Sequence, residues 1–180
     1  MLKSYKDKSK NKPYIIVEIS DKIMVNIMKK VRQILNIDSL HKNSIMGENV
    51  TVAVLDTGIY NHPDFGERII KYKDFVNGKT AIYDDEGHGT HVTGILAGDG
   101  KMSNGFFKGI APKSDIVSLK VLDKRGIGKE DNVISGIWWI IDNGKKYNIK
   151  VVNISFGTFN KEGNNKKLIE AVELLWDMLL

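Results

Sequence analysis

Apolar and polar positions alternate along the chain on two different periods. Short runs rich in Val and Ile, each bounded by turn residues, are typical of β-strands and occur at residues 50–55, 69–75, 115–122 and 149–155. Segments with small or apolar residues at helical spacing indicate helices at residues 88–98, 131–143 and 166–178, the second with Asp131 as its cap. The run at 50–55 is continuous and rich in β-branched residues, which favours a strand buried on both faces of a parallel sheet.

The first 47 residues differ in composition from the rest. Residues 1–12 contain five lysines and one aspartate, and so supply +4 of the formal net charge of +5. We expect this lysine-rich start to be a solvated tail, followed by a strand at 13–19 and a helix over 23–35. The polar stretch 38–48 indicates a boundary. We therefore predict an N-terminal extension over 1–47, which packs on or covers the main domain, and a main domain over 48–180.

Composition excludes several kinds of protein. No apolar run approaches the ~20 residues of a membrane span, and the start of the chain lacks the apolar core of a secretory signal, so we expect a cytoplasmic protein without membrane contact. No aromatic residues interleave with a basic patch, so we expect no nucleic-acid partner. The chain has no cysteine, which excludes disulfides and thiolate metal sites.

Candidate chemistry centres on His88, which lies between two glycines at the start of a predicted helix. Such a sequence is poor for helix stability, which points to function. The positive end of the helix dipole would keep the ring neutral and basic. Asp56 follows the buried strand, at the sheet edge where catalytic groups of α/β proteins gather. The alternatives are that Asp56 closes an Asx-turn and that His88 is a packing residue.

A metal centre is a less favoured interpretation of the same region. Asp84, Asp85 and Glu86 precede His88, and His91 follows it. The two histidines are three residues apart, however, whereas zinc-protease helices place them four apart with a glutamate between. We predict no metal ligands here.

Several motifs occur together in one order: Asp56-Thr57-Gly58, His62-Pro63-Asp64, His88-Gly89-Thr90-His91-Val92, Gly109-Ile110-Ala111-Pro112 and Asn153-Ile154-Ser155-Phe156-Gly157. From about residue 47 onward the chain resembles the subtilisin-like serine proteases, in particular their intracellular alkaline-protease branch. The resemblance implies a doubly wound, mostly parallel sheet with helices on both faces. It also implies an endopeptidase for peptide or protein substrates, with Asp56 and His88 as two members of an Asp-His-Ser triad.

The resemblance also implies a substrate cleft and no obligatory cofactor. In the family, the segment matching Gly126, Ile127 and Gly128 pairs with the substrate backbone, a task that needs an unobstructed edge. The segment matching Ser155, Phe156 and Gly157 forms one wall of the pocket for the residue before the scissile bond. An aspartate at the Asp64 position can help to hold a structural calcium ion, although residues 99–103 lack the asparagine-rich loop that usually accompanies it.

The sequence contains no counterpart of the family's nucleophile motif or of its oxyanion-hole asparagine. We therefore expect a C-terminally truncated, incomplete sheet and a chain that is inactive alone. The strand at 149–155 would then have an unpaired edge, which favours aggregation or self-association. Two alternatives are kept: a dimeric aspartic protease, whose signature is also Asp-Thr-Gly after an apolar strand, and an inactive remnant that acts by pairing through this edge.

Overall fold

A computed structural model describes residues 2–6, 13–17, 30–157 and 166–179. The chain divides into two compact units, Met1–Ser44 and Ile45–Leu180. Each unit is described by itself. None of the described helices is long and apolar enough to cross a membrane.

The first unit contains more regular structure than the sequence predicted. Strand β1 (Leu2–Lys6) pairs antiparallel with β2 (Pro13–Val17), so part of the stretch that was expected to be a tail forms a strand. Charge counting missed the strand because backbone pairing does not depend on side-chain charge. Residues 30–34 are helical, as predicted, whereas the helix expected over 23–29 lies outside the described residues.

A short helix, α2 (Ile37–Lys42), occupies part of the stretch that we took as a polar boundary. Ile37 is buried, and the Arg32 guanidinium bonds the Asp38 carboxylate at 2.6 Å. One buried apolar residue and an acidic residue in the first turn suffice for so short a helix, and neither gives a periodic signal.

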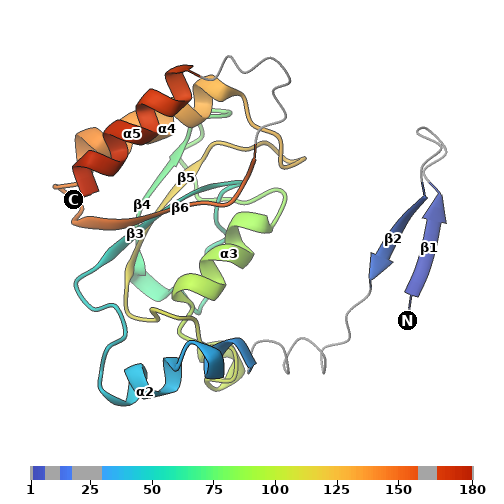
Figure 1. Ribbon diagram of the computed structural model, residues 1–180, viewed down its shortest axis with the longest axis vertical. Helices are drawn as coiled ribbons and strands as arrows, with labels where there is room; N and C mark the ends of the chain where they lie inside the picture. The colour runs from blue at the N-terminus through green and yellow to red at the C-terminus, as the bar shows by residue number, and fades with distance from the viewer. Residues whose placement is uncertain (1, 7–12, 18–29, 158–165, 180) are drawn as a thin grey trace. The chain divides into compact units, whose positions relative to one another are not determined.

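The second unit is built on a parallel sheet whose four strands lie in the order β4-β5-β3-β6 (Figure 1). All three neighbouring pairs are parallel, as expected for the apolar runs. In chain order the strands are β3 (Thr51–Asp56), β4 (Ile69–Asp74), β5 (Asp115–Lys120) and β6 (Ile149–Ile154). The central pair, β3 and β5, is almost completely buried, whereas β6 lies at an edge of this sheet.

Helices cover both faces of the sheet, which confirms the doubly wound α/β fold (Figure 1). They are α3 (His88–Ala97), α4 (Glu130–Asn143) and α5 (Lys166–Leu179). Helices α4 and α5 pack on the face that carries Leu55 and Leu119, and α3 packs on the opposite face, near Ile116. Helix α4 begins one residue before the expected cap: Lys129 is its N-cap and Asp131 lies in its first turn.

The connections place the start of α3 beside the end of β3. From β4 through α3 to β5, and from β5 through α4 to β6, the chain moves across the sheet in the same direction. The two helices nevertheless lie on opposite faces, so the two crossovers have opposite hands and one is of the rare left-handed kind.

Because the chain leaves β4 at its carboxyl end, the first turn of α3 lies at the sheet edge where β3 also ends.

Candidate active site

Asp56 and His88 are in contact, as their positions in the sequence predicted. Asp56 ends β3 on the same face as Val52, whose register partner Ile116 packs near α3. The Nδ1 atom of His88 lies 2.9 Å from Oδ1 and 3.0 Å from Oδ2 of Asp56. The Asp56 side chain is 1% exposed and the His88 side chain 45% exposed. A buried carboxylate thus holds one side of a ring whose other side is open to a reactant.

The helix dipole alone would lower the pKa of His88 and keep its ring neutral, but the pKa is shifted in the opposite direction. The hydrogen bond with Asp56 raises the pKa of His88 above its usual value, and this outweighs the opposing effect of burial. Glu86 and Asp84 add to the increase. With Nδ1 bonded to the carboxylate, Nε2 is the nitrogen that remains to exchange a proton with a reactant. The arrangement suits a base that must become an imidazolium.

Residues next to Asp56 on β3 and next to His88 on α3 hold the dyad in place. The backbone N–H of Thr57 donates to Oδ1 of Asp56 at 2.7 Å, a bond to the next residue rather than to the residue two positions on, as an Asx-turn requires. The N–H of Gly89 in turn donates to Oγ1 of Thr57 at 2.9 Å. A Cβ atom on Gly89 would collide with the carbonyl oxygen of Gly58. Glycine at position 89 therefore allows α3 to approach the end of β3 closely.

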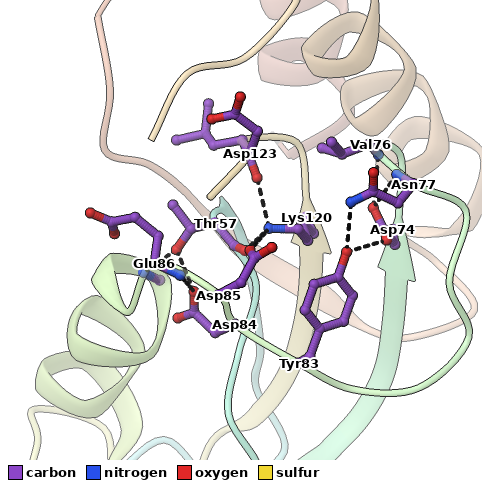
Figure 2. Close-up of polar contacts among 12 residues, drawn as sticks. Thr57, Asp74, Val76, Asn77, Tyr83, Asp84, Asp85, Glu86, Lys120 and Asp123 are labelled. Atoms are coloured by element: carbon purple, nitrogen blue, oxygen red, sulfur yellow. Dashed lines mark hydrogen bonds and ion pairs between the residues drawn. The ribbon is translucent and has the colours of Figure 1, made fainter. Parts of the chain in front are cut away.

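A network of polar side chains surrounds the loop that leads into α3 (Figure 2). Lys120 is fully buried, and it is the register partner of Asp56 on β5. Its Nζ atom donates to Oδ1 of Asp85 at 2.6 Å and to the carbonyl oxygens of Thr57 and Leu122 at 2.5 and 2.9 Å. The buried ammonium group thus ties the loop to the carboxyl ends of β3 and β5.

A pocket of about 480 Å³ brings together five of the six residues expected to bind substrate. These are Gly126, Ile127, Gly128, Phe156 and Gly157, and the remaining lining is mainly apolar, from Leu122, Val133, Ile137, Ile154, Leu168 and Val172. Ser155, the sixth, is exposed outside this lining, where its Oγ accepts a hydrogen bond from the Asn153 amide. Leu122, which lines the pocket, lies beside the end of β3, because its N–H donates to the backbone carbonyl oxygen of Asp56 at 3.2 Å.

The loop at one side of this pocket is a tight turn. Leu122 and Gly128 form an antiparallel bridge, and the Asp123 carboxylate accepts the N–H groups of Arg125 and Ile127. Gly126 has a φ of +70°, which favours glycine.

Comparison with known proteins decides the family. The family model described as "Subtilase family" matches residues 47–177. The chain belongs to the subtilase family. Serine protease AprX of Bacillus subtilis (strain 168) is 41% identical to it over 140 residues, which are 74% of this chain and 31% of AprX. A thermostable alkaline protease of Halalkalibacterium halodurans is 38% identical over 69% of this chain and 32% of its own length.

Solved structures agree with this subtilase assignment. A cold-adapted subtilisin-like serine proteinase matches 72% of this chain and 44% of its own, with a TM-score of 0.58 and 32% identity. Sphericase matches 73% and 44%, with a TM-score of 0.62 and 30% identity. The chain thus spans about a third of the length of the curated relatives and less than half of the solved structures.

Asp64 is the residue at which the subtilase resemblance implies a structural calcium ion. The Oδ1 atom of Asp64 accepts the N–H of Met102 at 2.8 Å and lies 3.8 Å from Nδ1 of His62. Within the described part of the chain, no three His, Asp or Glu residues are grouped so that they could hold a metal ion. Calcium takes six to eight oxygen ligands, so a site at Asp64 would need further oxygens, such as those of backbone carbonyls.

The roles of three residues near the dyad were not predicted from the sequence: Thr57, Lys120 and Asp84. Lys120 could have been found, because it is a charged residue at the end of an apolar strand that neighbours β3. The rule that placed Asp56 at the carboxyl edge applies equally to it. Asp84 was considered only as a metal ligand, although it lies four residues before the histidine and so within reach of the first helical turn.

Proposed function

We propose that this chain supplies the aspartate and the histidine of a subtilisin-type serine endopeptidase. In that reaction a serine hydroxyl attacks the scissile carbonyl, His88 accepts the hydroxyl proton and then gives it to the leaving amine. Asp56 fixes the ring with Nδ1–H toward the carboxylate and stabilises the imidazolium that forms. The chain offers no counterpart of the family's nucleophile motif, so the serine is the member of the triad to be identified.

The observation that carries this proposal is the contact between Asp56 and His88 at the carboxyl edge of the sheet. It favours a serine protease over a dimeric aspartic protease. In the latter, a second aspartate shares a proton with the first, and no histidine is needed. Here the Asp56 carboxylate accepts the His88 ring and the Thr57 N–H. The residues matched by the family model, 47–177, include both members of the dyad.

The pocket supports a preference for apolar side chains before the scissile bond. Its lining is mainly aliphatic, with Phe156 at one wall and Glu130 as its charged member. The exposed backbone from Gly126 to Gly128 is suited to pairing with an extended peptide, because glycines leave the edge unobstructed.

A chimera tests the proposed function. Residues 47–177 replace the matching segment of AprX, and cleavage of a peptide with an apolar residue before the scissile bond is measured. We expect hydrolysis at neutral to alkaline pH that a serine-directed phosphonate abolishes. His88→Gln serves as the inactive variant, and His91→Gln, an exposed histidine of the same helix, is the matched control that retains activity. A folded chimera that the phosphonate does not label, or that cleaves equally well with His88→Gln, would refute the proposal.

A second candidate function is self-association through β6. This strand lies at the edge of the described sheet, and its Val151 and Ile154 side chains are 46% and 37% exposed. An apolar edge strand pairs readily with another chain. We expect the 180-residue chain to sediment as oligomers at micromolar concentration and Val151→Lys to shift it toward monomer. Ile45→Lys, which changes an exposed apolar residue outside the sheet, should leave the distribution unchanged. A monomeric parent chain would refute this function.

A further inference from the structure

The Asp84 carboxylate joins the two elements that carry the dyad (Figure 2). Its Oδ1 atom accepts the hydroxyl of Thr57 at 2.9 Å and the N–H of Gly87 at 2.8 Å. Its Oδ2 atom accepts the N–H and the hydroxyl of Thr90 at 2.9 and 2.5 Å. Thr57 directly follows Asp56, and Gly87 and Thr90 lie on either side of His88. One side chain therefore spans from the end of β3 to the first turn of α3.

Helix α3 takes part of its N-terminal cap from this side chain, because its own first turn provides none. Its N-cap residue is Gly87, which makes no side-chain hydrogen bond, and its first turn contains no acidic residue. The free N–H groups of a first turn need acceptors, and a negative charge there also opposes the positive end of the helix dipole. Two carboxylates supply both from outside the helix: Asp84 accepts the N–H of Thr90, and Glu86 accepts the N–H of His88 at 2.8 Å. They thereby fix the turn on which His88 lies.

The charge state of Asp84 agrees with this role. Burial raises its pKa, but hydrogen bonds from Thr90, Gly87 and Thr57 outweigh burial, so that the pKa lies below its ordinary value. Asp84 is therefore ionised over the pH range in which His88 titrates. The groups that affect the His88 ring electrostatically are Asp56, Glu86 and Asp84 itself.

The loop that carries Asp84 is itself anchored on both sides. Its neighbour Asp85 accepts the buried ammonium of Lys120 at 2.6 Å. Its other neighbour Tyr83 donates its hydroxyl to Oδ2 of Asp74 at 2.7 Å, at the end of β4. Asp84 and Gly58 also form a backbone bridge. The carboxylate thus starts from a fixed backbone, which a positioning group requires.

We propose that Asp84 is a positioning residue that holds His88 against Asp56 by joining Thr57 to the first turn of α3. This role rests on the proposed function, in which His88 acts as the base. Asp84 makes no contact with the reacting atoms in this arrangement, and its effect passes through Thr57, Gly87 and Thr90.

The test follows the His88 ring by NMR titration in the 180-residue chain, so it requires no peptide cleavage. His88→Gln assigns the His88 signals, and Asp56→Asn gives the shift in pKa that results from full loss of the dyad contact. We expect Asp84→Asn to lower the pKa of His88 by at least half of that shift and to remove the downfield signal of its Nδ1–H. Asp99→Asn is the matched control, because Asp99 is a half-buried carboxylate that accepts the N–H of Lys101 outside the site.

A second variant separates position from charge. The double variant Thr57→Val with Thr90→Val removes two partners of Asp84 without changing any charge, and we expect it to lower the pKa of His88 in the same direction. If Asp84→Asn does not fold, the double variant alone tests the proposal. A pKa of His88 within about 0.2 units of the parent value in the folded double variant would overturn the proposal, and so would a retained Nδ1–H signal in Asp84→Asn. If Asp56→Asn itself left the pKa unchanged, the dyad of the proposed function would fail instead.

Discussion

Gly89→Ala is expected to separate His88 from Asp56 and to destabilise the second unit. The new methyl group would lie 3.1 Å from the Cβ of Asp56 and would collide with the carbonyl oxygen of Gly58. Both are parts of the rigid end of β3, so the first turn of α3 has to move away. That movement also stretches the hydrogen bond from the Gly89 N–H to Thr57. A misplacement of about 1 Å in such a group lowers turnover about 10²-fold.

Gly94→Ala is the matched control in the same helix. A Cβ atom at position 94 would meet no heavy atom within 4 Å. Alanine is the better helix former by roughly 1 kcal/mol, so this change is expected to be neutral or stabilising. Gly89→Ala, by contrast, is expected to cost about 1–3 kcal/mol, the usual penalty for overpacking a rigid site. Urea unfolding of the 180-residue chain measures the free energies of unfolding, and hydrolysis by the AprX chimera measures turnover.

The two glycine variants are informative because they share a helix and a chemical change. If Gly89→Ala were as stable as Gly94→Ala and kept the turnover of the parent chimera, close approach of α3 to β3 would not be what the glycine provides. Loss of turnover in both variants would point to a general sensitivity of α3 rather than to this contact.

The sheet could be predicted from the sequence because it depends on strong, local patterns, and these patterns also placed the two members of the dyad. Uninterrupted runs of Val and Ile predict buried strands, and a polar residue directly after such a run must lie at the carboxyl edge of a parallel sheet. The start of a helix that follows another parallel strand of the same sheet lies at that same edge. These patterns placed Asp56 and His88 at one edge, and the resemblance to the subtilisin-like proteases is what paired them as members of a triad.

The rest of the site depends on partners that are distant in the sequence. Nothing near Lys120 indicates that its ammonium group reaches Asp85, 35 residues earlier, because the contact exists only once β5 lies beside β3. The pKa of His88 was predicted in the wrong direction for a related reason. The helix dipole is a property of the local sequence, whereas the carboxylate that outweighs it comes from another element. Helix α2 was missed because six residues are too few to show a period.

Lys120→Met is expected to destabilise the second unit far more than Lys113→Met, although the two lysines make ion pairs of the same length. Each Nζ atom lies 2.6 Å from a carboxylate oxygen, of Asp85 and of Glu48 respectively. The Lys120 side chain is completely inaccessible, whereas the Lys113 side chain is 49% exposed. Exposed ion pairs contribute about 0–1 kcal/mol, so Lys113→Met should change the free energy of unfolding very little.

The larger effect at Lys120 comes from what the ammonium group leaves behind. Methionine fills a similar volume but donates no hydrogen bond, so the carbonyl oxygens of Thr57 and Leu122 lose a buried donor. Each such group left without a partner costs about 1–3 kcal/mol, so the two together give an expected loss of about 2–6 kcal/mol for Lys120→Met in urea unfolding. Asp85 is 37% exposed and regains water, so its charge adds little to this loss. Equal free energies of unfolding for the two variants would mean that the Lys120 network stabilises the fold no more than a surface ion pair does. The loop before α3 would then have to be held by backbone contacts alone.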